Sequence, residues 1–342
     1  MLNRINNYNL IVENRYAWLD LMKASSCLMV ILIHISAGYI NTLNPKNADW
    51  FLFNTINSFS RSCVPLFFMA SGYLFIKLKD IKIKNFLRLI SCIIFYNLLC
   101  ALYLCFYKDK SFLDIIKKSY RAPAMYHLWF FYSLLCCYSF FIFFSFKNKA
   151  PGILKIITGL FLCFFVFCYS FAVQTKGYSN SLNINYIINS EGAFYILYTL
   201  LGAQLGESDL KKIGFKVPFC LFIFSSTLIT LGTFYLSVRR GYFDSALYNY
   251  NTFLVSISAV FLFITFKNYT ITNAKVNNAL RFISKYSLPI YGTHLIFVDF
   301  IEKINLLHFK PLDFIIKLIF VLSLSIMVSM VIKKMDYKSI IS

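Results

Sequence analysis

The sequence predicts an all-α, polytopic membrane protein. Of its 342 residues, 59% are hydrophobic and 19% are aromatic, and the mean hydropathy is +0.65. A soluble domain is rarely more than about half apolar, whereas apolar runs of about 20 residues are long enough to cross a bilayer as helices. No soluble domain, linker or repeat interrupts this pattern. Residues 1–342 are therefore expected to form one membrane domain.

Ten apolar runs are long enough to be membrane-spanning helices. The connections between them contain Pro, Gly and Asn, which are typical of turns. The sixth run is the shortest and is interrupted by Gly202 and Gly206. The expected spans are 18–39, 50–76, 86–106, 127–146, 152–173, 191–206, 217–237, 249–266, 284–302 and 312–332.

The distribution of basic residues predicts the orientation. Ten spans place both chain ends on one side. With the N-terminus in the cytoplasm, the cytoplasmic segments carry 20 Lys and Arg residues and the opposite segments carry 11. Cytoplasmic loops are enriched in Lys and Arg, so we expect both ends inside (N-in/C-in), with residues 1–14 as a polar cytoplasmic tail. The basic connection 107–125 follows the third span, so with the N-terminus in the cytoplasm it is expected on the opposite side of the membrane, despite its charge.

The charge and the cysteines exclude two classes of partner. The formal net charge is +20, but the basic residues lie in loops between apolar runs, so no nucleic acid partner is expected. All ten cysteines fall in apolar runs, and no two have the C-x-x-C spacing of many metal sites. We expect them to be small packing residues, and we predict no metal site.

The run 18–39 contains three groups that hydrocarbon disfavours, Asp20, Lys23 and His34. Asp20, Cys27 and His34 are seven residues apart, a spacing that keeps them on one stripe of a helix, and Lys23 lies close to it. Ionisable groups in a spanning helix usually face a protein interior or a cavity and serve a function. The run therefore predicts a polar stripe, with Lys23 near the cytoplasm and His34 roughly 16 Å further along.

Arg61 is the charged residue of the second expected span. It should lie about 15 Å deep, next to Pro65, which should kink the helix. A guanidinium keeps its charge and has five N–H donors, so it suits an anion or a carbonyl oxygen. The other interpretation is that Arg61 has a structural partner, such as a helix-end carbonyl.

The loop 77–88 holds five basic residues within twelve positions. This cluster is either a topology signal or, together with Lys23, a site that binds phosphates. In the second case a nucleotide-bearing molecule could extend a thin arm along the stripe towards His34.

Several polar residues lie towards the far side or in mid-membrane. His127 opens the fourth span and is either a cap or part of a site. His294 lies near mid-membrane, one turn after Tyr291, and is either functional or bonded to another helix. Glu191 lies near the outer end of its span and either orients a hydroxyl or is solvated. We take these four residues as candidate substrate-binding groups, and His34, Arg61 and Asp20 as candidate catalytic groups, with His34 as a general base because imidazole titrates near neutral pH.

These residues resemble the acyltransferase-3 superfamily, ten-helix membrane enzymes that transfer acyl groups from cytoplasmic acyl-CoA to sugar hydroxyls. That family has an Arg eleven residues before an essential histidine, and here Lys23 and His34 occupy these positions. The family also has a basic pair three residues apart at the start of the third helix. Arg88 matches its second member, Asn85 occupies the first position, and Lys84 is adjacent.

Further segments are similar to the single-domain branch of this family that O-acetylates enterobacterial common antigen. Together with the first span they run in order along almost the whole chain. The segments are Ser60 to Phe75 (SRSCVPLFFMASGYLF), Tyr126 to Leu134 (YHLWFFYSL), Phe194 to Gly202 (FYILYTLLG) and Ile283 to Leu295 (ISKYSLPIYGTHL).

The resemblance implies an O-acetyltransferase of the bacterial inner membrane. Acetyl-CoA would be a donor substrate and not a permanently bound cofactor, with its phosphates held by Lys23, Lys84 and Arg88. His34 would deprotonate a hydroxyl of a cell-surface or lipid-linked glycan, or would first help to move the acetyl group across the membrane. The alternative is a membrane carrier for a small metabolite or lipid-linked sugar, which would use the same charges for binding. Carriers usually contain internal repeats, and we find none.

Overall fold

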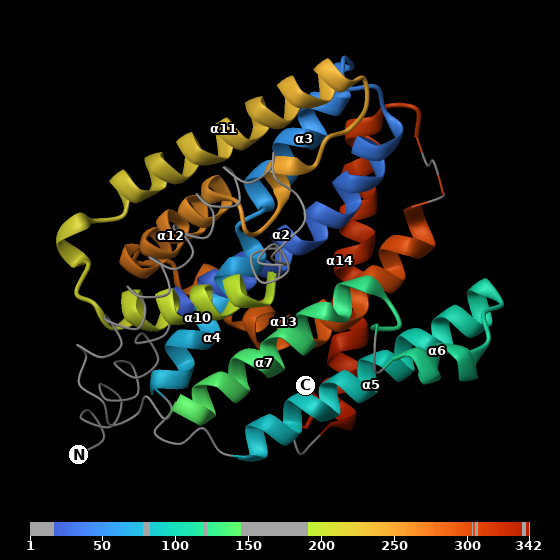
Figure 1. Cartoon of the computed structure of the whole chain (residues 1–342), viewed down its shortest axis with the longest axis horizontal. Helices are drawn as coiled ribbons and strands as arrows, with labels where there is room; N and C mark the ends of the chain where they lie inside the picture. Colours follow the sequence, from blue (N-terminus) through green and yellow to red (C-terminus); the bar gives the residue numbers. More distant parts are fainter. Residues whose placement is uncertain are drawn as a thin grey trace, which may run out of the picture.

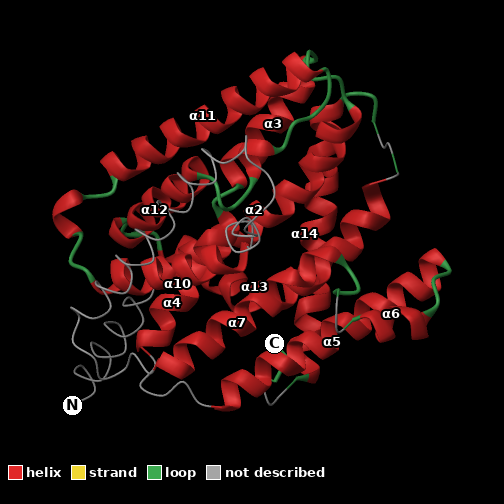
Figure 2. Cartoon of the chain, viewed as in Figure 1, coloured by secondary structure: helices red, strands yellow, loops and turns green. Residues whose placement is uncertain are grey.

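The computed structural model describes residues 17–77, 83–119, 122–144, 191–302, 304, 307–336 and 340–341. Within these ranges every regular element is a helix and none is a strand (Figure 2), so the all-α prediction is confirmed. Six of the described helical segments are long and apolar enough to cross a membrane, as expected of a multi-pass membrane protein. The expected span 152–173 and the tail 1–14 lie outside the described residues.

The helices form one bundle, with α11 along one edge and α6 at the opposite edge (Figure 1). Short 3-10 turns precede α7, α11 and α12. The elements are α2 (Ala17–Thr42), α3 (Ala48–Ser60), α4 (Cys63–Lys77), α5 (Ile83–Lys108), α6 (Phe112–Lys118), η1 (Tyr126–Leu128), α7 (Trp129–Phe144), α10 (Glu191–Glu207), η3 (Lys211–Ile213), α11 (Lys216–Arg240), η4 (Ala246–Tyr248), α12 (Phe253–Asn268), α13 (Ala274–Glu302) and α14 (Lys310–Met335).

Helix α2, the predicted first span, is the central element of the bundle. It packs against α3, α4, α12, α13 and α14. Small residues on α2, among them Ala24, Ser26 and Ser36, are buried, which lets neighbouring helices approach closely. The polar stripe therefore lies inside the protein along much of its length.

The second expected span is interrupted, as Pro65 predicted. Helix α3 ends at Ser60 and α4 begins at Cys63, with Arg61 and Ser62 in the break. Pro65 lies in the first turn of α4, where the backbone N–H groups have no partner within the helix, so that a residue without an N–H destabilises the helix least. The break separates the end of α3 from α4 and places Arg61 between them.

Helices α4 and α10 touch through their backbones. A Cβ added at Gly72 would overlap the backbone of Thr199, and a Cβ added at Gly202 would overlap the backbone of Met69. Glycine at such contacts allows close packing of membrane helices. Gly202, which made the sixth span look interrupted, is thus a packing residue within a continuous helix.

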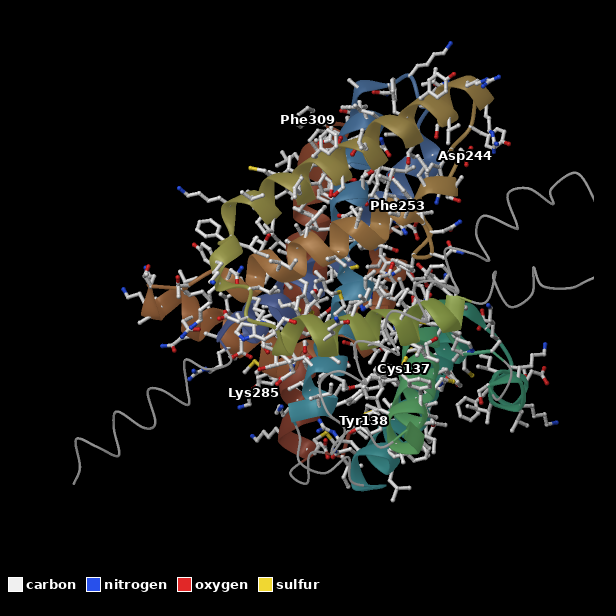
Figure 3. All side chains as sticks on the ribbon, turned by 60° about the vertical axis from the view of Figure 1, so that its left-hand side comes forward. Cys137, Tyr138, Asp244, Phe253, Lys285 and Phe309 are labelled. Atoms are coloured by element: carbon white, nitrogen blue, oxygen red, sulfur yellow. The ribbon has the colours of Figure 1, made fainter. Side chains whose placement is uncertain are left out.

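The two ends of the bundle differ in the residues that they carry. Figure 3 places Lys285, on α13, at the opposite end from Asp244 and from Phe309, which precedes α14. Lys23 lies near the start of α2, and Thr42 is its last residue. We refer to the two ends as the Lys23 end and the Thr42 end.

Candidate functional site

Three histidines meet in the interior. The ring centroids of His34 (α2) and His294 (α13) are 5.2 Å apart, and those of His294 and His127 (η1) are 5.1 Å apart. His127 is 1% exposed and His294 is fully buried. We call these three residues the histidine cluster. Within the described ranges, no group of three or more His, Cys, Asp or Glu side chains is placed to hold a metal ion.

Backbone carbonyls fix the protonation of two of the rings. Nδ1 of His294 lies 2.7 Å from the Tyr291 carbonyl oxygen, and Nε2 of His127 lies 3.3 Å from that of Gly292. A carbonyl only accepts, so each of these nitrogens must donate. The other nitrogen of each ring is buried and has no hydrogen-bond partner within the described part of the chain. The cluster therefore presents acceptor nitrogens to its surroundings.

His34 is held by a tyrosine. The Tyr126 hydroxyl lies 2.9 Å from His34 Nδ1, and the two rings meet edge to face. When Nδ1 donates to the phenol oxygen, Nε2 carries the lone pair that can accept a proton. Tyr126 was not among the predicted site residues, and its sequence signals are its position beside His127 and at the start of the family-like segment Tyr126 to Leu134.

The histidine cluster borders a small cavity of about 40 Å³. His34, His127 and Tyr291 line it, and so do Cys63 and Tyr250. The Tyr291 hydroxyl donates to the His127 carbonyl oxygen at 2.6 Å. A cavity of this size holds one or a few water molecules.

Arg61 lies beside α2 and has a defined partner. Its Nε donates to Asn57 Oδ1 at 2.8 Å, its Nη2 donates to the same oxygen, and its guanidinium stacks over the Tyr248 ring at 4.2 Å. Asn57 Nδ2 in turn donates to the Ile33 carbonyl oxygen at 3.1 Å and to Ser36 Oγ at 2.8 Å. Arg61 is therefore linked through Asn57 to both sides of His34.

A larger pocket of about 290 Å³ opens at the Lys23 end. Four basic residues from four helices line it: Lys23, Arg88, Lys285 and Lys333. The Lys333 ammonium also donates to the Lys285 carbonyl oxygen at 3.1 Å. We call this the basic pocket. Lys285 and Lys333 were missed as site residues because their position in expected cytoplasmic segments made them look like topology signals.

Tyr291 connects the basic pocket to the histidine cluster. Its side chain lines both the basic pocket and the cavity beside His34. The remainder of the inner wall of the basic pocket includes Phe67, Phe130 and Phe131. The two hollows thus share one wall residue, Tyr291, and aromatic side chains line the basic pocket next to it.

Three candidates lie elsewhere. Asp20 accepts a hydrogen bond from Ser284 Oγ at 2.6 Å. It precedes His34 by fourteen residues, which is about 21 Å along the helix. The structure therefore does not bring Asp20 to the histidine cluster. Lys84 lies in the first turn of α5 and Glu191 is the first residue of α10. The side chains of Lys84 and Glu191 lie outside the described part of the structure.

Comparison with known proteins identifies one family. The model of a family described as an acyltransferase domain, acyltransferase 3, matches residues 16–334, nearly the whole chain. No curated protein matches the chain. No solved structure matches it.

Proposed function

The chain belongs to this acyltransferase family, and on that premise we propose that it is an O-acetyltransferase of the bacterial inner membrane. The donor is acetyl-CoA, and the acceptor is a hydroxyl of a cell-surface or lipid-linked glycan. The observation that carries the proposal is that Tyr291 lines both the basic pocket and the cavity beside His34. This arrangement suits a long donor with an anionic end and a reactive end.

The basic pocket suits the nucleotide end of CoA. Ammonium and guanidinium groups bind phosphates by charge-assisted hydrogen bonds, and Lys23, Arg88, Lys285 and Lys333 line one pocket. Its aromatic inner wall suits the pantetheine arm. By the positive-inside rule, the Lys23 end faces the cytoplasm. Cytoplasmic acetyl-CoA can therefore enter the basic pocket directly.

The histidine cluster suits the transfer step. His34 Nε2 accepts the proton of the acceptor hydroxyl while the hydroxyl oxygen attacks the thioester carbonyl. The tetrahedral intermediate collapses with cleavage of the C–S bond, and the CoA thiolate takes the proton from His34. Arg61 has N–H groups beyond the two that Asn57 accepts, and we assign them to the oxyanion. His127, Tyr291 and His294 orient the acceptor.

The test is acetyl transfer by the purified full chain in detergent. The substrates are radiolabelled acetyl-CoA and glycans extracted from the cell envelope of the producing strain. We expect His34→Ala to lower the transfer rate by about 10²-fold or more, the range of a lost general base. His308→Ala, which removes an exposed histidine outside the cluster, should keep the wild-type rate.

Normal transfer by His34→Ala would refute the assigned chemistry. A carrier, the alternative, would show a different result. The wild-type protein would neither be stabilised by CoA nor consume acetyl-CoA, and a solute would cross proteoliposomes that contain it.

A further inference from the structure

A third hollow lies at the Thr42 end, one helical turn beyond the histidine cluster. Its volume is about 370 Å³, and its lining comes from α2, α13 and α14. Gly38 and Val298, which line it, follow His34 and His294 by four residues, so each lies one turn further along the same helix face. The hollow therefore continues the contact between α2 and α13 that brings the two histidines together. We call it the far pocket.

Glu302 provides a carboxylate in the far pocket, close to the backbone of α2. A Cβ added at Gly38 would lie 2.9 Å from Glu302 Oε1, so glycine leaves the room that this carboxylate occupies. Glu302 is exposed, and a hydrated carboxylate accepts hydrogen bonds from hydroxyl groups. The carboxylate thus forms part of the pocket wall beside Gly38, on the helix face that continues from His34.

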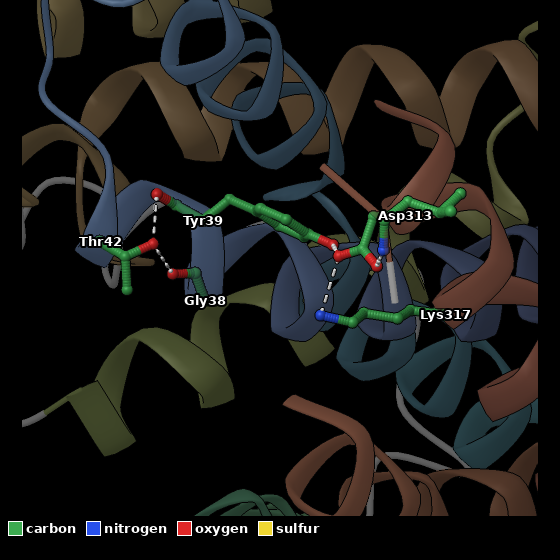
Figure 4. A network of polar contacts seen from close by, with 6 residues as sticks. Gly38, Tyr39, Thr42, Asp313 and Lys317 are labelled. Carbon is green, nitrogen blue, oxygen red and sulfur yellow. Dashed lines mark hydrogen bonds and ion pairs between the residues drawn. The ribbon is translucent and has the colours of Figure 1, made fainter. Parts of the chain in front are cut away.

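Two residues of the far-pocket wall, Tyr39 and Lys317, belong to a polar network that is shown in Figure 4. The Tyr39 hydroxyl donates to Asp313 Oδ2 at 2.5 Å, and the Lys317 ammonium lies 3.0 Å from the same oxygen. Asp313 is fully buried, and Lys317 is 4% exposed. The Lys317 charge is therefore compensated by Asp313 before any ligand arrives.

The remaining charges of the far pocket favour a neutral ligand. Glu302 contributes one negative charge and Lys310 one positive charge. The Thr42 hydroxyl, which lines the pocket, donates to the Gly38 carbonyl oxygen at 2.9 Å (Figure 4). The lining holds two lysines and one glutamate, and one of the lysines, Lys317, is paired with the buried Asp313, whereas the charged residues that line the basic pocket are all basic. A neutral molecule with several hydroxyl groups fits this balance better than a phosphate does.

We propose that the far pocket binds a sugar ring of the acceptor glycan, with Glu302 as a positioning residue that accepts hydrogen bonds from the ring hydroxyls. The pocket volume lies in the range of about 300–1,000 Å³ that is typical of small-molecule sites. A ring held there is one helical turn from His34, and one of its hydroxyls can point towards that residue. This inference rests on the proposed function, because it assigns the binding site of the second substrate.

The experiment separates acceptor binding from donor binding. Initial transfer rates of Glu302→Gln are measured with acetyl-CoA and the extracted envelope glycans, each varied in turn. We expect the KM for the glycans to rise about tenfold or more, the effect of a lost charged hydrogen bond, while the KM for acetyl-CoA stays within about twofold. Gly38→Leu, which fills the pocket from α2, should have the same effect.

The matched control is Asp109→Asn. Asp109 is an exposed carboxylate just after α5, and asparagine tolerates its positive φ of 49°. The variant should leave both KM values unchanged. An unchanged glycan KM in folded Glu302→Gln and Gly38→Leu, with folding shown by stabilisation with CoA, overturns the inference. Failure of the proposed function looks different, because wild-type protein would then neither be stabilised by CoA nor consume acetyl-CoA, and the inference would fall with it.

Discussion

The buried ion pair between Asp313 and Lys317 allows a quantitative test of how much a charge pair within α14 stabilises the protein. Asp313 is fully buried, accepts from Tyr39 and from the Leu307 backbone N–H at 3.2 Å, and lies 3.0 Å from the Lys317 ammonium. Asp313→Leu leaves that ammonium buried without its counter-charge. Removing one partner of a buried pair typically costs about 3–5 kcal/mol, whereas replacing both by apolar residues is often near neutral. We expect a loss of about 3–5 kcal/mol of unfolding free energy for the single variant.

The assay is unfolding of the full chain in mixed micelles with increasing SDS, followed by tryptophan fluorescence. The variants Asp313→Leu, Lys317→Met and the double variant form a cycle that isolates the pair. We expect the double variant to recover most of the stability that Asp313→Leu loses. Ser323→Ala, at an exposed position of α14, should match the wild type. An interaction energy below about 0.5 kcal/mol, the level of independent sites, would refute the reasoning.

Three further predictions concern the basic pocket, the helix packing and the histidine cluster. The double variant Lys285→Ala/Lys333→Ala should raise the KM for acetyl-CoA by about 100-fold or more, since it removes two charged hydrogen bonds that contribute about 1.5–3 kcal/mol each, and an unchanged KM in steady-state kinetics would contradict this. Gly202→Val should yield little folded protein by size-exclusion chromatography, because its Cβ overlaps the Met69 backbone, and a normal monodisperse peak would exclude that contact. Tyr126→Phe should lower kcat by about tenfold, the effect of one hydrogen bond, and rates equal to wild type would show that the bond to His34 is dispensable.

The ends of the helices show what hydropathy alone misses. The expected span 284–302 lies within α13, but the helix begins ten residues earlier, at Ala274. Asn273 accepts from the backbone N–H groups of Lys275 and Val276, at 2.9 and 3.3 Å, and so caps the helix. The first turns are polar, so a search for apolar runs omits them, although the cap residue marks the true start.

The histidine cluster shows a second limit. His34, His127 and His294 were each predicted as candidates, because a polar group in an apolar run needs an explanation. Their meeting depends on how α2, η1 and α13 pack, and the three residues lie too far apart in sequence for any spacing rule to indicate it. Lys285 and Lys333 were hidden for the opposite reason, because basic residues are common at cytoplasmic helix ends.

Arg61 shows why two interpretations of one residue can both hold. The sequence allowed either a structural partner or a ligand, and the structure provides the partner, Asn57. A guanidinium has five N–H groups, and Asn57 accepts two, so a structural role does not use up the donors. Asn57 also donates to the Ile33 carbonyl oxygen and to Ser36 Oγ of α2, so it joins Arg61 to the helix turn that carries His34. Loss of Asn57 should therefore disturb the position of His34 as well as that of Arg61.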